Sequence, residues 1–109
     1  MALTPEGEIV AYAKKRLKEK GCLCRKIAYE GRRGCPDMLV LVPYREMVWS
    51  GGVEKFKPQV VFIEFKKDEN TEPEPHQLRE HERMAAAGAD VRVIGTRQQV
   101  DELVEELFP

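Results

Sequence analysis

The chain has 109 residues, of which 42% are hydrophobic and 34% charged, with a formal net charge of −1. A chain of this length can form one hydrophobic core, and its composition excludes a disordered tail. No apolar run approaches the ~20 residues of a transmembrane helix, and the first residues lack the regions of a secretory signal peptide. We therefore expect a single domain over residues 1–109, in the cytoplasm, with no membrane partner.

Charge is distributed unevenly along the sequence. Residues 13–33 carry nine basic residues against two acidic ones, whereas residues 67–109 carry eleven acidic against five basic. Both a basic face for phosphates and a solvated helix surface explain this pattern. The three cysteines make a poor disulfide framework and lack the partners of a zinc site, so we expect them to be reduced and mostly buried.

The N-terminal segment has the pattern of an amphipathic helix. Thr4 is a good N-cap, and Pro5 suits the first helical position. Apolar residues then recur at helical spacing until Gly21, a typical stop signal, which predicts a helix over residues 5–20. The same criteria predict six more elements, which are strands over residues 23–29, 38–42, 60–66 and 91–94 and helices over residues 76–87 and 97–107.

Residues 44–58 are harder to assign. Ser50, Gly51 and Gly52 mark a turn and Pro58 precedes the next strand, so the segment fits either a hairpin or a flexible loop. The predicted elements follow the order α-β-β-β-α-β-α, with no internal repeat and no linker. This alternation predicts an α/β sheet covered by helices.

Charged residues at the ends of two apolar strands are the most informative feature of the sequence. Asp37 lies at the entry of the strand over residues 38–42, whereas Glu64 and Lys66 lie near the end of the strand over residues 60–66. Residues two apart on a strand point to the same face, so Glu64 and Lys66 share one face. Such charges are costly to bury unless they are paired or bind a metal.

Two interpretations fit these charges. If the strands are neighbours, Asp37 and Glu64 supply carboxylates to a hard divalent cation, and the Phe65 carbonyl supplies another oxygen. The cation then polarises a phosphodiester and lowers the pKa of a bound water, while Lys66 orients that water or offsets charge on the phosphate. The alternative is an internal salt-bridge cluster of Asp37, Glu64 and Lys66 with no catalytic role.

The helices offer further candidates. Glu6 continues the apolar stripe of the first helix, whereas Glu8 falls well off it, so we prefer Glu6 as an additional site acid. The helix dipole alone also favours an acid in the first turn. In the helix over residues 76–87, Gln77 is placed to touch a phosphate or a metal-bound water, and His81 fits a packed or surface histidine better than a ligand.

Several of these residues form a family pattern. The loop of residues 32–37, Arg-Arg-Gly-Cys-Pro-Asp, resembles an RRG-x-PD loop, and Glu64-Phe65-Lys66 completes a PD…ExK pattern. Gln77 followed by Gly88 resembles a Q…G helix. Over about residues 4–96 the chain therefore resembles the virus-type replication-repair nuclease (VRR-NUC) family of the PD-(D/E)XK nuclease superfamily.

That resemblance implies a restriction-endonuclease-like fold with a central mixed sheet flanked by helices. It also implies a nuclease that depends on Mg²⁺ or Mn²⁺, with Glu6, Asp37 and Glu64 as acidic site residues, Lys66 as the catalytic lysine and Gln77 in support. Small members, often from phages, are similar to Holliday-junction resolvases and act as homodimers. The implied substrate is branched DNA such as a four-way junction, in the cytoplasm of a host cell.

The basic residues Lys26, Arg32 and Arg33 flank the expected site and are the expected phosphate contacts, which read shape rather than base sequence. Residues 44–58 exceed the short turn that the family often has, and their Met47–Trp49 run would serve either the dimer or DNA. Two other functions stay open: a flap- or end-processing nuclease acting as a monomer, and a DNA- or partner-binding module without turnover.

Overall fold

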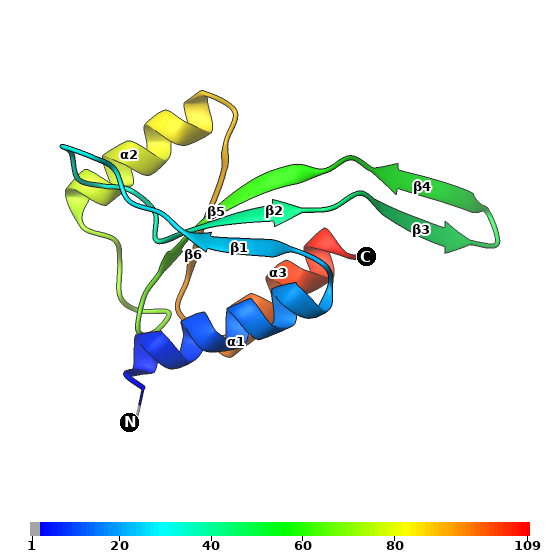
Figure 1. Ribbon diagram of the computed structural model, residues 1–109, viewed down its shortest axis with the longest axis horizontal. Helices are drawn as coiled ribbons and strands as arrows, with labels where there is room; N and C mark the ends of the chain where they lie inside the picture. The colour runs from blue at the N-terminus through cyan, green and yellow to red at the C-terminus, as the bar shows by residue number, and fades with distance from the viewer. Residues whose placement is uncertain (1–2) are drawn as a thin grey trace.

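A computed structural model describes residues 3–109 of the chain (Figure 1). Met1 and Ala2, where the segment inspected for a signal peptide begins, lie outside the described residues. In residues 3–109, no helix has the length and apolar character that a membrane crossing requires. In chain order the elements are α1 (Pro5–Glu19), β1 (Leu23–Lys26), β2 (Met38–Val42), β3 (Arg45–Trp49), β4 (Gly52–Phe56), β5 (Gln59–Phe65), α2 (Pro75–Ala86), β6 (Asp90–Ile94) and α3 (Arg97–Leu107).

Four strands form a mixed central sheet in the order β1-β2-β5-β6. The β1/β2 and β2/β5 pairs are antiparallel, whereas β5 and β6 are parallel. Figure 1 shows α1 and α3 side by side on one face of this sheet and α2 on the other. The predicted α/β architecture, a mixed sheet flanked by helices, is therefore confirmed.

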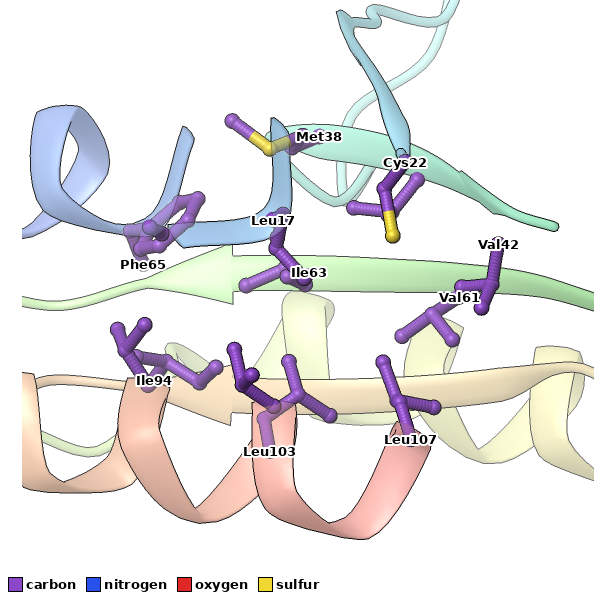
Figure 2. Close-up of a cluster of buried hydrophobic side chains, with 14 of the residues drawn as sticks. Leu17, Cys22, Met38, Val42, Val61, Ile63, Phe65, Ile94, Leu103 and Leu107 are labelled. Carbon is purple, nitrogen blue, oxygen red and sulfur yellow. The ribbon is translucent and has the colours of Figure 1, made fainter. Parts of the chain in front are cut away.

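The hydrophobic core lies between the sheet and the pair α1/α3 (Figure 2). Val61, Ile63 and Phe65 alternate along β5 into this core, where they meet Leu17 of α1 and Leu103 of α3. Burial of each such side chain contributes roughly 1.5–3 kcal/mol of transfer free energy. The register of β5 is thereby fixed, because a slip of one residue would turn its apolar set outward and Glu64 into the core.

The prediction of a strand over residues 23–29 is wrong in its length, because β1 ends at Lys26. The Ile27 N–H still donates to the Asp37 carbonyl oxygen at 3.2 Å, but the chain then leaves the sheet. Tyr29 donates instead to Glu80 of α2 at 2.5 Å. This contact with the opposite layer draws the chain away from the sheet.

Residues 44–58 form a hairpin, which resolves the alternative left open by the sequence. β3 and β4 pair antiparallel around a tight turn at Ser50 and Gly51 and project beyond the sheet (Figure 1). At the base of the hairpin, the Arg45 guanidinium lies 5.6 Å from the ring centre of Phe108, just after α3. An isolated two-stranded hairpin is marginally stable in water, so this contact with the body of the molecule helps to hold it.

The face of the sheet opposite α1 and α3 is only partly covered. Leu23, Leu41 and Val60 stand in register across β1, β2 and β5, and they are 50%, 40% and 41% exposed. We call these three residues the open sheet face. Helix α2 covers the other end of the same face, where Glu64 lies.

Candidate active site

The two strands that carry the expected acids are neighbours, and this brings Asp37 and Glu64 together. Met38 pairs with Ile63, so strand alternation places the residue before Met38 beside the residue after Ile63. An oxygen of Asp37 accepts a hydrogen bond from the Phe65 N–H at 2.7 Å. The turn into β2 is thereby tied to the end of β5, where the second acid lies.

Glu64 is a buried carboxyl group without a strong compensating partner. Its side chain is 3% exposed, its Oε2 lies 3.8 Å from the Lys66 Nζ, and its Oε1 makes no hydrogen bond. Burial raises the pKa of Glu64 to about 8, and the hydrogen bond with Asp37 and the charge of Asp37 add to this rise. The nearby Lys66 ammonium opposes the rise without cancelling it.

Lys66 is held in place by α2. Its Nζ donates to the Gln77 Oε1 at 2.9 Å, and the same oxygen accepts the Glu74 N–H at 2.9 Å in the first turn of the helix. The Lys66 N–H donates to the Ile94 carbonyl oxygen of β6 at 2.8 Å. Gln77 therefore contacts the lysine itself, whereas the sequence had suggested a contact with phosphate or bound water.

An open cleft of about 300 Å³ lies between α1 and the start of β2. Its lining includes two acids, Glu6 and Asp37, and two lysines, Lys14 and Lys26. Glu8 instead lines a separate hollow with Tyr12 and other residues of α1. Of the two candidate acids in the first helix, the structure thus brings Glu6 to Asp37.

These donors fit a hard divalent cation that takes part of its coordination from water and substrate. In the described part of the chain, no three His, Cys, Asp or Glu side chains gather into a ready-made metal cage. Mg²⁺ does not need one, because it is commonly bound by one or two carboxylates plus water and phosphate oxygens. The unpartnered Oε1 of Glu64 and its closeness to Asp37 are features that a cation would compensate.

The loop before Asp37 is fastened to α2 through Glu80. The Glu80 carboxylate is nearly buried and accepts hydrogen bonds from Tyr29 Oη at 2.5 Å and from Arg32 Nη2 at 2.9 Å. Burial and the hydrogen bond to this carboxylate raise the pKa of Tyr29 to about 12. We call Tyr29, Arg32 and Glu80 the loop clamp.

Gly34 allows this loop to approach the helix closely. Its φ of +98° lies in the left-handed region, and a Cβ placed there would stand 3.1 Å from the Glu80 Cβ and 3.2 Å from the His76 carbonyl oxygen. Only glycine combines that backbone conformation with so short a separation. Gly34 therefore contributes to the position of Asp37, three residues further on.

The expected phosphate contacts differ in their surroundings. Lys26 is exposed and lines the cleft, and Arg33 is exposed on the loop. Arg32 is 57% exposed but is already engaged with Glu80. Lys14, which the sequence analysis did not single out, adds a second cation to the cleft, one turn of α1 after the apolar stripe reaches Val10.

His81, which the sequence indicated as a packed or surface histidine rather than a ligand, lies beside this site. It is buried, as a packed histidine should be, but its Nε2 lies 3.7 Å from the Glu64 Oε1. Burial and the Lys66 charge lower the pKa of His81, which favours the neutral imidazole. The available signal was its position four residues after Gln77, on the same helix face.

Comparison with known proteins shows which family the chain resembles. No protein-family model matches the chain. A solved structure described as a VRR_NUC domain is 48% identical, covers 94% of this chain and 97% of its own, and superposes with a TM-score of 0.79. A phage protein, "Putative nuclease p44" of Acyrthosiphon pisum secondary endosymbiont phage 1, is 31% identical over 97 residues, 89% of either chain.

A mixed sheet that brings two acids and a lysine together, with relatives of this kind, defines a nuclease. More narrowly, the chain belongs to the VRR-NUC family. The resemblance indicated by the RRG-x-PD loop and the Glu64-Phe65-Lys66 strand is thereby confirmed.

Proposed function

We propose that the chain is a Mg²⁺- or Mn²⁺-dependent endodeoxyribonuclease that hydrolyses phosphodiester bonds in branched DNA, with four-way junctions as the preferred substrate. The observation that carries the proposal is the buried Glu64 beside Asp37, because two acids in this position are unfavourable without a cation. The nuclease class rests on the family, and the choice of branched DNA extends it.

The residues of the site divide the chemistry among them. Asp37 and Glu64 would hold the cation, and Glu6 and the Phe65 carbonyl would complete the protein's share of the ligands. A cation bound there supplies a Lewis acid for the phosphodiester and lowers the pKa of a coordinated water. Lys66, which is held by the Gln77 side chain, orients the attacking water or stabilises negative charge that develops on the phosphate.

The basic residues beside the site would hold the DNA backbone. Lys14 and Lys26 line the cleft next to Asp37, and Arg33 is exposed on the loop that precedes it. Contacts of this kind position a nucleic acid without reading its sequence. This arrangement agrees with recognition of DNA shape. Arg32 would contact phosphate while it stays paired with Glu80.

We further propose that the enzyme acts as a homodimer, since two sites related by a two-fold axis can cut symmetric strands of a junction. The open sheet face supports this, because contiguous exposed apolar residues mark interaction surfaces. On the hairpin, Val48 and Val53 pair across the strands and are 70% and 51% exposed. We therefore assign the Met47–Trp49 run to the dimer rather than to DNA.

The three cysteines, all within the described residues, are unpaired, which supports a reducing compartment such as a host cytoplasm. For Cys22, burial raises the pKa to about 11, which keeps this thiol protonated and unreactive at neutral pH. This agrees with a packing role for the residue in the core.

Cleavage of synthetic DNA tests the proposed reaction. A four-way junction, a flapped duplex and a linear duplex are each incubated with Mg²⁺, Mn²⁺ or EDTA. Cutting of the four-way junction is expected only with metal. Asp37→Asn keeps an oxygen for the Phe65 N–H but loses the charge, so the rate should fall at least about 100-fold. Undiminished cutting by Asp37→Asn would remove the site assignment.

Controls and substrates separate the other functions. Glu6→Gln should slow cutting, whereas Glu8→Gln, a matched acid on the same helix outside the cleft, should not. Preferential cutting of flapped DNA by a monomer would favour the end-processing nuclease. Binding of DNA and Mn²⁺ without cutting of any substrate would favour a module without turnover.

A further inference from the structure

Two buried polar atoms without hydrogen-bond partners face each other in the active site. Within residues 3–109, three buried side-chain atoms lack a partner, and two of them are the Glu64 Oε1 and the His81 Nε2. They lie 3.7 Å apart, and their side chains are 3% and 11% exposed. Unpartnered buried polar atoms are rare in folded proteins, so a facing pair calls for a functional explanation.

Simple packing does not explain the pair. Hydrogen bonds between nitrogen and oxygen span about 2.7–3.2 Å, so the two atoms, 3.7 Å apart, are not hydrogen-bonded. A buried donor or acceptor without a hydrogen bond costs about 1–3 kcal/mol of stability. An apolar side chain at position 81 would avoid that cost if the residue only filled space against Glu64.

The rest of α2 points to a positioning role. Gln77 holds the Lys66 Nζ at 2.9 Å, and His81 follows one helical turn later. Glu80 holds the loop that leads to Asp37. Gln77 and Glu80 thus hold Lys66 and the loop before Asp37, and His81 is the residue of α2 that faces Glu64.

We propose that His81 is a positioning residue: its Nε2–H faces the Glu64 Oε1 across 3.7 Å and donates to it when the carboxylate holds a divalent cation, which fixes the orientation of that carboxylate. Its other oxygen, Oε2, already lies on the Lys66 side, so a hydrogen bond to Oε1 defines the rotation of the group. Groups that orient metal-binding carboxylates in this way commonly affect metal affinity 10- to 100-fold. The inference rests on the proposed function for the role of Glu64.

Binding of Mn²⁺ alone, measured by calorimetry without DNA, tests the positioning role. His81→Leu removes the donor and should weaken Mn²⁺ binding about 10-fold or more. His81→Gln keeps an N–H at similar reach and should bind within about threefold of the unchanged protein. His76→Leu, a matched change on the same helix outside the site, should leave the Kd unchanged.

Stability is controlled separately, because a structural role alone would change Tm without changing the Kd of folded protein. If His81→Leu does not fold, His81→Asn replaces it, since the shorter amide cannot reach Glu64 and should bind Mn²⁺ as weakly as predicted for leucine. Equal affinities for the unchanged protein and a folded His81→Leu or His81→Asn would overturn the proposal. So would a loss in His81→Gln as large as in His81→Leu, which would indicate direct coordination instead.

The same measurements distinguish this proposal from the proposed function. If Mn²⁺ binding depends on His81 but no DNA is cut, the nuclease proposal fails and the positioning role stands. If DNA is cut and Mn²⁺ binding ignores His81, the positioning role fails and the nuclease proposal stands. An unchanged protein that binds no Mn²⁺ at all contradicts both.

Discussion

Among the single residues, Glu64 has the most unusual surroundings. It follows Ile63 and precedes Phe65, both fully buried in the apolar core, yet its own side chain points to the opposite face beside Asp37 and His81. A carboxyl group in this position is kept protonated up to a higher pH than in water. The pH dependence of folding should therefore report on this one residue.

The first prediction concerns stability in EDTA. Because the pKa of Glu64 is about 8 in the fold against 4.5 ordinarily, the unfolded chain releases this proton at lower pH. The contribution of Glu64 to stability is thus fully present below pH 4.5 and is lost as pH rises toward 8. Glu64→Gln should gain roughly 1–3 kcal/mol relative to the unchanged protein between pH 5 and pH 8, measured by thermal unfolding.

Ile63→Val is the matched control, since it alters the neighbouring buried residue without removing an ionisable group. Its cost of about 0.5–1.5 kcal/mol should be the same at every pH. A pH-independent difference for Glu64→Gln would contradict the environment assigned to Glu64. A large loss of stability in Glu64→Gln at pH 8 would instead support the salt-bridge interpretation.

Among the elements, the loop between β1 and β2 shows how a motif acts through contacts within the protein. In the RRG-x-PD segment, Arg32 pairs with Glu80 of α2 and Gly34 lies against the same residue. A partly exposed ion pair alone contributes little, but here the Tyr29 hydroxyl donates a hydrogen bond to the same carboxylate. The motif therefore holds the loop on α2 and so places Asp37.

The second prediction compares two glycines of this loop. Gly34→Ala should cost about 2–4 kcal/mol, because the backbone is left-handed and the added methyl group meets Glu80 and the His76 backbone. The rate of DNA cutting should also fall about 10-fold or more, because the loop that leads to Asp37 must shift. Thermal unfolding and single-turnover cleavage measure the two effects.

Gly31→Ala serves as the control, because its φ of +72° is also left-handed but nothing lies within 4 Å of the added Cβ. It should cost only about 1–2 kcal/mol for the backbone and leave the cutting rate unchanged. Equal effects on cutting from the two variants would show that close approach to α2 does not position Asp37.

The elements also show what a sequence can predict. The helix over residues 97–107 and the buried strand over residues 38–42 are predicted with their observed bounds, because each has a clear apolar pattern. The strand over residues 23–29 was predicted too long, because local pattern cannot foresee that Tyr29 bonds to a residue 51 positions away. The hairpin stayed ambiguous because both of its faces are mostly exposed.

The candidate site likewise contains residues that the sequence predicts and contacts that it does not. Asp37, Glu64 and Lys66 could be predicted because charges at the ends of apolar strands are conspicuous in sequence. The contact of Gln77 with Lys66 and that of His81 with Glu64 could not, because they depend on how α2 lies across the sheet. Polar residues on a helix face leave no periodic signal that names their partners.

At the scale of the whole molecule, one sheet face is sealed by two helices and the other is shared between α2 and open surface. The open sheet face lies on the same side as Asp37 and Glu64, because the registered strands alternate in phase. A second copy docked there would form the proposed homodimer, with the sheet face that carries Asp37 and Glu64 turned toward the partner in each chain. This would suit a substrate with two equivalent strands.

The third prediction tests that pairing. Light scattering should find the unchanged protein as a dimer, and Leu41→Lys should weaken dimerisation at least about 30-fold, the equivalent of ~2 kcal/mol. Circular dichroism should confirm that the variant is folded, since Leu41 is 40% exposed. Paired cutting of a four-way junction should become two independent cuts.

Leu3→Lys is the control, because Leu3 is 57% exposed near the start of α1, outside the open sheet face. It should leave the dimer intact. A monomeric unchanged protein would contradict the homodimer and favour an end-processing nuclease. A dimer that survives Leu41→Lys would place the interface elsewhere.

The two helical layers are held by different forces. Helices α1 and α3 bury only apolar side chains, whereas the two buried residues of α2 are Glu80 and His81. Ionic strength and pH act on contacts of the second kind and leave the first kind almost untouched. We therefore expect the α2 layer to loosen and re-form its contacts as solution conditions change, while the hydrophobic layer of α1 and α3 stays folded.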